Sequence, residues 1–367
     1  ENSRILVIGA AGSIGAAVTK ELFRRKPECL HAVDISENNL VSLVRNIRST
    51  LGYTTGDFST FCLDVGSTEC DIFLQSQKKY DYVLNLSALK HVRSEKDPFT
   101  LMRMIKTNIF NSIRLHDYCA LKSSEKYFCI SSDKAANPEN LMGATKRIME
   151  LFAFSKAETS PVSMARFANV AFSDGSLLHG FRERLYSRQP ISAPLDIERY
   201  FITPKEAGQL CLMSALLCNS GEILFPSNVQ EIKPIAFSEI ATRYLRSQSL
   251  EPYLCESEEE ARMFFNKKKT KDNLYPCYFF KTDTTGEKAL EEFFTSKETI
   301  DLGRFEQAGI VQPDIDINKL ELKKFKIQID KMMNAFKLDK NEIIETIRIL
   351  LPEMSYFDNG KYLDGKM

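Results

Sequence analysis

The sequence carries no excess of charge of either sign. Its 367 residues include 49 Lys and Arg against 49 Asp and Glu, so the formal net charge is zero. A protein that binds nucleic acid through a broad electrostatic surface needs a basic excess, so this composition excludes that class. With 43% hydrophobic and 27% charged residues, the chain has instead the composition of a globular protein with a large core.

Long hydrophobic runs are also missing. The longest, from Leu210 to Cys218, has nine residues, whereas a helix needs about 20 to cross a bilayer. This predicts no membrane span. Residues 1–4 are followed at once by the apolar run that starts at Ile5, without a basic region before a long apolar stretch, so we expect no signal peptide.

Paired cysteines are absent as well. The nine cysteines are an odd number, scattered without a C-x-x-C pair or a cluster with histidine. This pattern is typical of reduced, mostly buried thiols in a cytoplasmic protein, and it predicts neither disulfides nor a metal site. Three of the four histidines, His31, His116 and His179, have no partners visible in the sequence, and we interpret them as structural.

What the sequence does contain is an alternation of short apolar runs and amphipathic stretches. The expected strands are Ile5–Ile8, Cys29–Val33, Thr60–Leu63, Tyr82–Leu86 and Tyr127–Ile130. The stretches with helical spacing of apolar residues are Ala16–Arg25, Asn38–Thr50 and Thr100–Cys119. This β-α-β rhythm predicts an α/β fold with a doubly wound, Rossmann-type parallel sheet.

The rhythm loosens after about residue 166, where prolines break the chain into shorter elements. We therefore expect a Rossmann domain over residues 1–165, to which later segments return, and a smaller mixed α/β substrate lobe over residues 166–312. Residues 313–367 would form a C-terminal helical extension and tail.

Two segments of the second half are notable for charge or periodicity. The charged segment 255–272 is interpreted as a solvated helix and loop. Lys340 to Leu351 is predicted to be an amphipathic helix stopped by Pro352. The polar tail that follows is expected to be either frayed or docked on a partner subunit.

A glycine-rich turn follows the first expected strand. Gly9, Gly12 and Gly15 enclose Ser13 and Ile14 at the start of the first helix. Glycine permits the tight turn, the close approach of a pyrophosphate and the packing of the helix on the strand, in that order. The helix N-terminus adds N–H donors and partial positive charge, so the turn predicts a dinucleotide site.

Two carboxylates follow the next strands. Asp34 closes the second strand, where it can accept hydrogen bonds from an adenosine ribose and would repel a 2′-phosphate. This favours NAD and leaves NADP open. Asp64, just after the third strand, is placed to meet the adenine amino group, and an ordinary loop Asp is nearly as consistent with the pattern.

The G-x-x-G-x-x-G spacing is similar to that of the short-chain dehydrogenase/reductase superfamily. Four further blocks, in family order, resemble the nucleotide-sugar 4,6-dehydratases of bacterial polysaccharide biosynthesis, the UDP-N-acetylglucosamine 4,6-dehydratase or CapD-like family. They are Asn85–Val92, Lys106–Asn108, Ile130–Pro138 and Met142–Arg147. The resemblance implies an extended fold of this superfamily and further cofactor contacts from Val65, Ser87, Ala88, Lys90, Asn108 and Lys146.

In extended short-chain dehydrogenases a Tyr-x-x-x-Lys pair deprotonates the sugar hydroxyl. Here Lys146 is present, but Met142 stands at the Tyr position. A thioether cannot take a proton, so another group must deprotonate O4. The membrane-anchored branch of the dehydratases resembles this Met version, whereas the soluble branch that inverts C5 has Tyr. The resemblance therefore favours retention at C5.

Ser132, Asp133 and Lys134 follow the strand that ends at Ile130, at the carboxyl edge where open α/β sheets carry their chemistry. A 4,6-dehydration needs an acid for the departing C6 hydroxyl and a base for the C5 proton. Asp133 is the candidate acid and Lys134 the candidate base, provided that burial raises the first pKa and lowers the second. Ser132 can hydrogen-bond O4.

Substrate contacts are implied by weaker resemblances along the rest of the chain, which continue to about residue 310. The candidates are Lys90, His91, Asn169, Ser176, Arg199 and Glu287. Arg199 is the first choice for the diphosphate because a planar guanidinium suits it; Arg166 and Arg199 could instead form ordinary surface ion pairs. Thr284 stands where the family has a phosphate-binding Arg, which leaves the nucleotide base open.

The leading interpretation is a cytoplasmic UDP-N-acetylglucosamine 4,6-dehydratase of surface glycan or nonulosonic acid synthesis that uses bound NAD. The alternatives are a GDP-N-acetylglucosamine 4,6-dehydratase, a nucleotide-sugar 4-epimerase and a non-catalytic NAD-bound scaffold. The expected partner is the nucleotide-sugar substrate, not nucleic acid. The resemblance also implies a homo-oligomer, with Thr100–Cys119 and Met142–Lys156 as the usual pairing helices.

Overall fold

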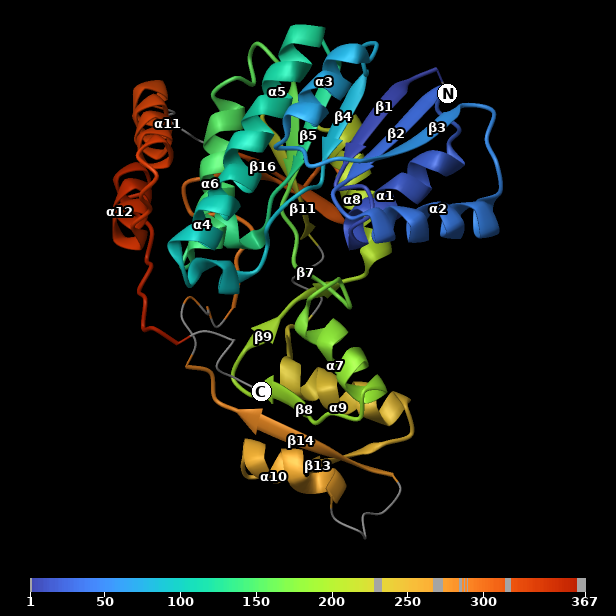
Figure 1. Ribbon diagram of the computed structural model, residues 1–367, viewed down its shortest axis with the longest axis vertical. Helices are drawn as coiled ribbons and strands as arrows, with labels where there is room; N and C mark the ends of the chain where they lie inside the picture. Colours follow the sequence, from blue (N-terminus) through green and yellow to red (C-terminus); the bar gives the residue numbers. More distant parts are fainter. Residues whose placement is uncertain are drawn as a thin grey trace. The chain divides into compact units, whose positions relative to one another are not determined.

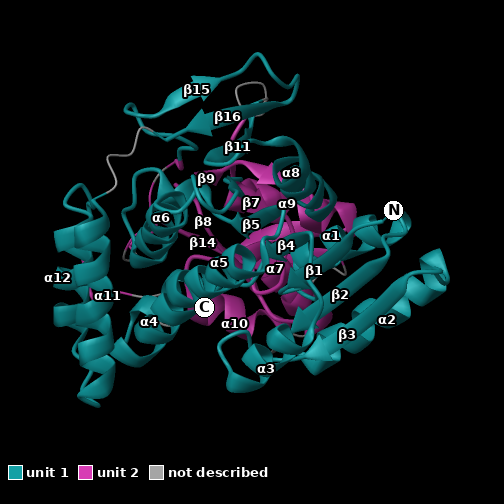
Figure 2. Ribbon diagram, turned by 90° about the horizontal axis from the view of Figure 1, so that it is seen from above, with its two compact units in different colours: residues 1–167, 204–228, 292–357 teal, residues 168–203, 229–291, 358–367 magenta. Residues whose placement is uncertain are grey.

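The computed structural model describes residues 2–227, 233–266, 273–283, 286, 288, 290–313 and 318–361. The chain divides into two compact units. Unit 1 comprises residues 1–167, 204–228 and 292–357, and unit 2 comprises residues 168–203, 229–291 and 358–367 (Figure 2). Each unit is therefore assembled from three separate stretches of sequence. The expected three-part division at residues 165 and 312 stays a prediction.

Unit 1 is built on a nine-stranded sheet with the order β15-β16-β11-β6-β5-β4-β1-β2-β3. Strands from β11 to β3 run parallel, whereas β16 pairs antiparallel with both β11 and β15. The strands are β1 Arg4–Ile8, β2 Cys29–Asp34, β3 Asp57–Cys62, β4 Tyr82–Asn85, β5 Lys126–Ile130, β6 Val162–Ala165, β11 Glu222–Pro226, β15 Thr299–Asp301 and β16 Ala308–Gln312. The order β3-β2-β1-β4-β5-β6 is that of a Rossmann fold, which confirms the predicted fold class.

Helices cover both faces of this sheet, with α1 and α8 packed together on one face and α5 and α6 on the other (Figure 1). The strands are consequently buried on both sides, as Ile5, Leu6, Val7 and Ile8 are in β1. The helices of unit 1 are α1 Ser13–Arg24, α2 Glu37–Leu51, α3 Thr68–Ser76, α4 Pro98–Ile105, α5 Asn111–Lys122, α6 Leu141–Phe154, α8 Pro204–Leu217, α11 Lys319–Asn334 and α12 Lys340–Leu350. A π-helical turn, Lys106–Phe110, joins α4 to α5.

Boundaries differ from the sequence-based expectation at the third strand. β3 runs from Asp57 to Cys62 rather than from Thr60 to Leu63. The strand starts early because the backbone N–H of Asp57 already donates to Glu28 O (2.9 Å), which begins the pairing with β2. The residues before Thr60 are too polar for an apolar pattern to detect this edge strand.

The C-terminal helices α11 and α12 form a hairpin that packs on α4 and α6 (Figures 1 and 2). α12 confirms the predicted amphipathic helix. The hairpin contributes the following buried residues to the shared cluster: Leu322, Phe325, Ile329, Met332, Ile343, Ile344 and Ile347. They cover apolar side chains of the helices that the family resemblance assigned to subunit pairing, among them Leu101, Ile105, Ile148 and Phe152.

The segment that follows α12 also packs on its own chain. Leu351, Met354 and Tyr356 are buried in the same cluster, and Ser355 N donates to Pro138 O (3.2 Å). The expectation that the tail after Pro352 frays is therefore wrong for residues 353–356, whereas its docking on a partner subunit stays a prediction. Apolar residues interspersed with the polar ones account for the difference. Residues 362–367 lie outside the described part of the chain.

Two isoleucines on α11 provide a matched test of this packing. Ile329 is fully buried, whereas Ile327 is 56% exposed. We expect Ile329→Ala to lower the free energy of unfolding by about 2–5 kcal/mol, because it removes buried methyl groups and leaves a cavity. Ile327→Ala should change it by less than about 0.5 kcal/mol. Urea unfolding of both variants measures the difference, and equal effects would show that the hairpin is not packed as described.

Unit 2 contains a three-stranded parallel sheet, β13-β14-β8, and two short two-stranded pairs, β10-β7 and β12-β9. Its elements are β7 Asn169–Val170, α7 Leu177–Tyr186, β8 Ile191–Pro194, β9 Glu198–Arg199, β10 Phe201–Ile202, β12 Ile235–Ala236, α9 Phe237–Ser247, β13 Glu251–Leu254, α10 Glu258–Met263 and β14 Leu274–Phe280. Its core packs α7 and α9 on β8 and β14. Within the charged segment 255–272, α10 exposes Glu259, Arg262 and Met263 and buries Ala261, and residues 267–272 lie outside the described part.

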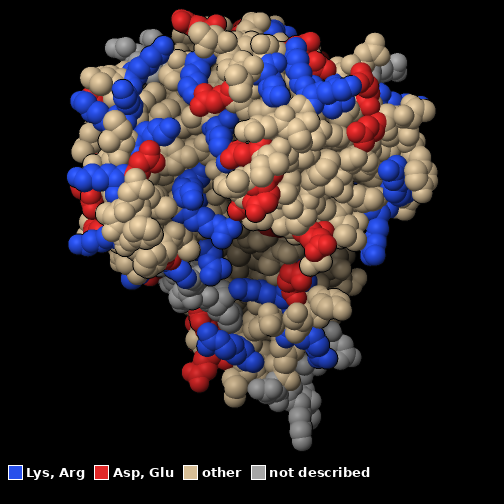
Figure 3. Space-filling view, turned by 45° about the horizontal axis from the view of Figure 1, so that its top comes forward, with Lys and Arg blue, Asp and Glu red and all other residues tan. Residues whose placement is uncertain are grey.

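Charged side chains of both signs intermingle on the face of the molecule drawn in Figure 3. This agrees with a net charge of zero. Within the described residues, none of the helices combines the length and the apolar character that a bilayer crossing requires.

Candidate active site

The glycine-rich turn joins β1 to α1, and its geometry explains why two of its positions require glycine. Gly9 has φ +74°, and a Cβ there would lie 2.6 Å from Ser87 N. A Cβ on Gly15 would lie 1.9 Å from Gly9 O. Gly12 differs, because the nearest atom to a Cβ there is 3.8 Å away. The space beside Gly12 is therefore left open by the chain itself.

α1 begins at Ser13, followed by Ile14, directly after Gly12. Its first turn has no acidic residue, and no described side chain caps it by a hydrogen bond. A helix N-terminus without a carboxylate keeps its partial positive charge for a ligand. Together with the space at Gly12, the turn fits the pyrophosphate of a dinucleotide.

Asp34 lies at the end of β2, against the same turn. Its Oδ2 accepts from Ala11 N and its Oδ1 from Ser36 N, both at 2.9 Å. The carboxylate is 8% exposed and rigidly held, and each oxygen retains capacity to accept a ribose hydroxyl. Asp64 follows β3 in an exposed turn, where its Oδ1 accepts from Gly66 N (2.7 Å), and Val65 beside it is buried.

The loop after β4 carries Ser87, Ala88 and Lys90. Ser87 Oγ donates to Asn85 Oδ1 (2.6 Å), Ala88 is half-buried and Lys90 is exposed. Asn108, fully buried in the π-helical turn, binds this loop at Leu89: its Oδ1 accepts from the Leu89 N–H (2.9 Å) and its Nδ2 donates to the Leu89 carbonyl (3.0 Å). These contacts make Asn108 a support for the loop.

His91 is half-buried just beyond this loop. Burial, together with the nearby charges of Lys90 and Arg93, lowers the pKa of His91 below its ordinary value of 6.5. The imidazole is therefore neutral at pH 7, where it can accept or donate a hydrogen bond but adds no charge for a phosphate.

Met142 and Lys146 lie one turn apart on α6, and both are 3% exposed. Lys146 Nζ donates to Ile130 O (2.9 Å), and burial lowers the pKa of Lys146 to about 8. The Met142 N–H donates to Oε1 of Glu95 (2.7 Å), a fully buried carboxylate. Glu95 was missed from the sequence, because a single Glu in a polar stretch gives no sign that it is buried under a helix N-terminus.

The pKa of Lys146 predicts a gain in stability when its charge is removed. The folded pKa of about 8 lies below the ordinary value of 10.5, so between these values the unfolded chain binds more protons and stability rises with pH. At neutral pH the buried positive charge of Lys146 therefore destabilises the folded state. We expect Lys146→Met to raise the free energy of unfolding there by about 1–3 kcal/mol, after allowance for the lost hydrogen bond.

This gain should shrink as the pH rises through that window and vanish above 10.5, where the wild-type amine is neutral in both states. Chemical unfolding of both proteins at several pH values measures it. A Met variant that is less stable than wild type at neutral pH would mean that the lysine is not buried as described.

Ser132, Asp133 and Lys134 are brought together directly after β5. Asp133 is 4% exposed, and its Oδ1 accepts from Ser132 Oγ (2.8 Å), Lys134 N (2.9 Å) and Lys134 Nζ (3.1 Å). The Lys134 side chain is 16% exposed. A hydroxyl, a carboxylate and an amine thus form one hydrogen-bonded chain at the carboxyl edge of the sheet, where open α/β folds bind their substrates.

The remaining candidates belong to unit 2. Asn169 begins β7, where its N–H donates to Tyr200 O (3.2 Å), and Ser176 caps α7 by accepting from His179 N (3.2 Å). Arg199 is buried and forms an ion pair with Glu291 at 3.8 Å. Glu287 and Thr284 lie outside the described residues.

Arg166 is not the surface residue that one sequence-based alternative allowed. It is fully buried and hydrogen-bonded to Glu150 and Glu298. The surface alternative is wrong because these three residues, far apart in the sequence, meet in the interior of unit 1. Their separation in the sequence gave no signal of this contact.

The sheet order and the glycine turn define a Rossmann-type protein. A family model described as "Polysaccharide biosynthesis protein" matches residues 5–313. The chain belongs to this family.

Relatives of known sequence agree with this assignment. "Uncharacterized membrane protein MJ1061" of Methanocaldococcus jannaschii is 28% identical over 97% of this chain and 97% of its own length. "Capsular polysaccharide biosynthesis protein CapD" of Staphylococcus aureus is 28% identical over 81% of this chain, which spans 48% of that protein. A UDP-N-acetylglucosamine 4,6-dehydratase (inverting) of Campylobacter jejuni is 28% identical over 60% of this chain and 66% of its own length.

Solved structures share the fold. Pen from Bacillus thuringiensis superposes with a TM-score of 0.69 at 20% identity, covering 86% of this chain and 90% of Pen. DesIV, a dTDP-glucose 4,6-dehydratase from Streptomyces venezuelae solved with NAD bound, gives a TM-score of 0.58 at 14% identity, covering 79% of this chain and 87% of DesIV. The chain thus shares its family with polysaccharide biosynthesis proteins and its fold with a nucleotide-sugar dehydratase.

Proposed function

We propose that the chain is a UDP-N-acetylglucosamine 4,6-dehydratase that retains the configuration at C5. Its product would be a UDP-linked 4-keto-6-deoxy-N-acetylhexosamine for surface glycan or nonulosonic acid synthesis in the cytoplasm. One observation carries the proposal: a serine hydroxyl, a buried carboxylate and an amine are hydrogen-bonded in series at the carboxyl end of β5. This is the set of groups that an elimination between C5 and C6 requires.

NAD is the proposed cofactor. The glycine turn with Ser13 and Ile14 would hold its pyrophosphate, Asp34 its adenosine ribose, and Asp64 and Val65 its adenine, while Ser87, Ala88, Lys90 and Lys146 would line the nicotinamide side. When bound, NAD supplies the acceptor for the C4 hydride and its donor to C6, so no net redox change occurs. Asp34 favours NAD over NADP because its negative charge would repel a 2′-phosphate.

Three side chains divide the proton transfers between them. The O4 proton passes through the Ser132 hydroxyl to Asp133, since the two are 2.8 Å apart. Asp133, now a carboxylic acid, protonates the departing C6 hydroxyl to give water. Lys134, acting as a neutral amine, takes the C5 proton and later returns it to the same face. Each proton is accounted for, and no Tyr at position 142 is needed.

The identity of the sugar nucleotide rests on relatives. The Campylobacter jejuni relative, a UDP-N-acetylglucosamine 4,6-dehydratase, supports a UDP-linked N-acetylhexosamine. That relative is inverting, whereas Met142 supports retention here. Lys90, His91, Asn169, Ser176, Arg199 and Glu287 are the proposed substrate contacts. We also propose a homo-oligomer; because α11 and α12 cover part of α4 and α6, pairing through these helices would use the faces that the hairpin leaves uncovered.

The test is to incubate purified protein, without added cofactor, with UDP-N-acetylglucosamine and separately with GDP-N-acetylglucosamine, and to follow product mass. Loss of one water identifies the dehydratase and its nucleotide, and the sugar configuration of the product reports on C5. A product of unchanged mass with inverted C4 would identify an epimerase instead. No conversion of either sugar by protein that holds NAD would support a non-catalytic scaffold.

A further inference from the structure

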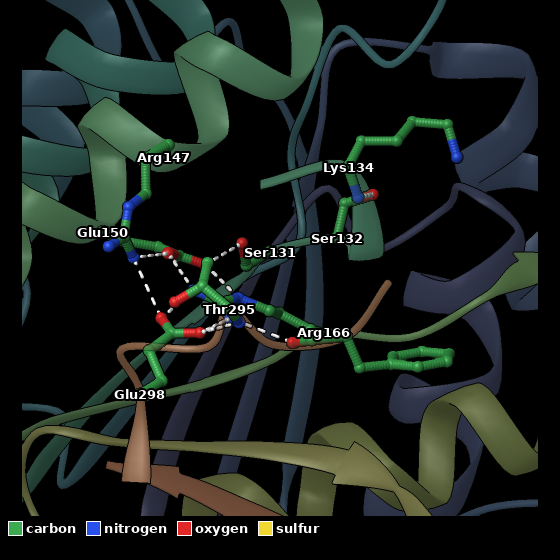
Figure 4. Close-up of polar contacts among 9 residues, drawn as sticks. Ser131, Ser132, Lys134, Arg147, Glu150, Arg166, Thr295 and Glu298 are labelled. Carbon is green, nitrogen blue, oxygen red and sulfur yellow. Dashed lines mark hydrogen bonds and ion pairs between the residues drawn. The ribbon is translucent and has the colours of Figure 1, made fainter. Parts of the chain in front are cut away.

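A cluster of four charged side chains, of which Glu150, Arg166 and Glu298 are buried, lies next to the proposed reaction centre (Figure 4). Arg166, directly after β6, binds Glu150 of α6 through Nε–Oε1 (2.9 Å) and Nη2–Oε2 (2.6 Å). It binds Glu298, just before β15, through Nη1–Oε2 and Nη2–Oε1, both at 2.9 Å. Arg147 adds contacts to both carboxylates at 3.0 and 3.2 Å. Two positive and two negative charges thus balance inside unit 1.

Glu150 also reaches the strand that leads into the reaction centre. Ser131 Oγ donates to Glu150 Oε1 at 2.5 Å. One turn earlier on α6, Lys146 Nζ donates to the carbonyl of Ile130. Two side chains of α6 therefore hold the last two residues before Ser132, and the Ser131 N–H is fixed as well, by Ala165 O (2.9 Å).

Glu150 is itself held in a single orientation. Although burial raises its pKa, the charges of Arg166 and Arg147 and the hydrogen bonds of Arg166 and Ser131 outweigh that effect and keep the pKa of Glu150 below its ordinary value. The carboxylate is therefore ionised, with both oxygens occupied by guanidinium groups. It cannot rotate away from Ser131 without breaking these bonds.

Stability alone gives no reason for this arrangement. Burying charges costs free energy that their mutual attraction barely offsets, and apolar side chains of the same volume would join the elements equally well. Apolar side chains could not hold the hydroxyl of Ser131, because this requires a fixed acceptor. The position of that hydroxyl fixes Ser131, and therefore the starting point of the Ser132-Asp133-Lys134 segment that follows it.

We propose that Glu150 is a positioning residue for the dehydration, acting through Ser131 on the Ser132-Asp133-Lys134 segment, with Arg166 and Glu298 holding it in place. This inference rests on the proposed function, since it assigns the segment a reaction to serve. The Ser131 hydroxyl links the charged cluster to the segment, and a single small substitution removes it.

Ser131→Ala is the decisive variant, because Glu150→Gln would leave Arg166 with an uncompensated buried charge and mix folding with activity. Its matched control is Ser163→Ala, since Ser163 Oγ is equally buried in β6 and donates to Ser214 O (2.8 Å). Both variants lose one buried hydrogen bond. We expect kcat to fall about 10–100-fold in Ser131→Ala with KM within about twofold, because small misplacements of reacting groups have effects of this size. Ser163→Ala should stay within about twofold in both.

Crystal structures of the two variants provide a readout that does not depend on the reaction. Displacement of the Asp133–Lys134 pair in Ser131→Ala alone is the expected result. Equal kcat in the two variants, or an unmoved pair in Ser131→Ala, would overturn the positioning role. If wild type converts no nucleotide sugar, the proposed function fails, and the position of the pair in the crystals still decides whether Glu150 and Ser131 place it.

Discussion

Turnover is expected to fall by about 10²–10⁴-fold when Lys134 is replaced by alanine, the range that general acid–base groups contribute. The amine is 3.1 Å from Asp133 Oδ1 and is the candidate base for the C5 proton. Its loss should also abolish exchange of the C5 proton with heavy water. NAD should stay bound, because the glycine turn and Asp34 do not depend on Lys134. Steady-state rates, deuterium incorporation and protein-bound NAD are measured on the same preparation.

Lys134→Arg is the matched control for charge. Arginine keeps the positive charge beside Asp133 but does not deprotonate in a protein. We therefore expect it to remain as inactive as the alanine variant. Recovery of turnover in Lys134→Arg would mean that position 134 supplies a charge rather than a base, and unchanged turnover in Lys134→Ala would remove it from the mechanism.

The second large effect is expected at Gly15. A Cβ there would lie 1.9 Å from Gly9 O, a backbone atom of the turn itself. Gly15→Ala must therefore push α1 away from the turn, and we expect it to lower the free energy of unfolding by about 3 kcal/mol, the upper part of the usual range for overpacking. NAD binding should be lost with it, because the helix N-terminus moves. Thermal unfolding and cofactor content measure the two effects.

Gly12→Ala tests the role of the turn in cofactor binding separately from its role in packing α1. The nearest atom to a Cβ at Gly12 is 3.8 Å away, so the folded chain can accommodate the methyl group. The free energy of unfolding should therefore change by less than about 1 kcal/mol. The methyl group would occupy the space proposed for the pyrophosphate, so NAD affinity should still fall. A Gly12→Ala variant that binds NAD as wild type does would contradict this cofactor site, and an unaffected Gly15→Ala would contradict the packing of α1.

The sequence predicted those features that depend on neighbours along the chain. The apolar run at Ile5–Ile8, the glycine turn and the amphipathic helix before Pro352 each carry a local pattern, and the structure contains all three. Ser132, Asp133 and Lys134 are consecutive in the sequence, so their proximity could be predicted without knowledge of the fold. The polar beginning of β3 at Asp57 had no such pattern.

Contacts between segments that are distant in the sequence could not be predicted from it. Arg166 meets Glu150 and Glu298 because α6, β6 and the segment before β15 converge, and a single sequence gives no sign of such convergence. The burial of Glu95 under α6 and the docking of Tyr356 on its own chain have the same origin. In each case the sequence shows the residue type, but the surroundings of the side chain depend on tertiary packing.

The central claim is that hydrogen moves within one sugar, from C4 to C6, while water is lost. The most direct measurement uses UDP-N-acetylglucosamine carrying deuterium at C4, incubated with purified protein and no added cofactor, with the product analysed by mass and by NMR. We predict a product that has lost one water and carries the deuterium at C6. Deuterium that remains at C4 of a sugar with unchanged mass would contradict the dehydratase.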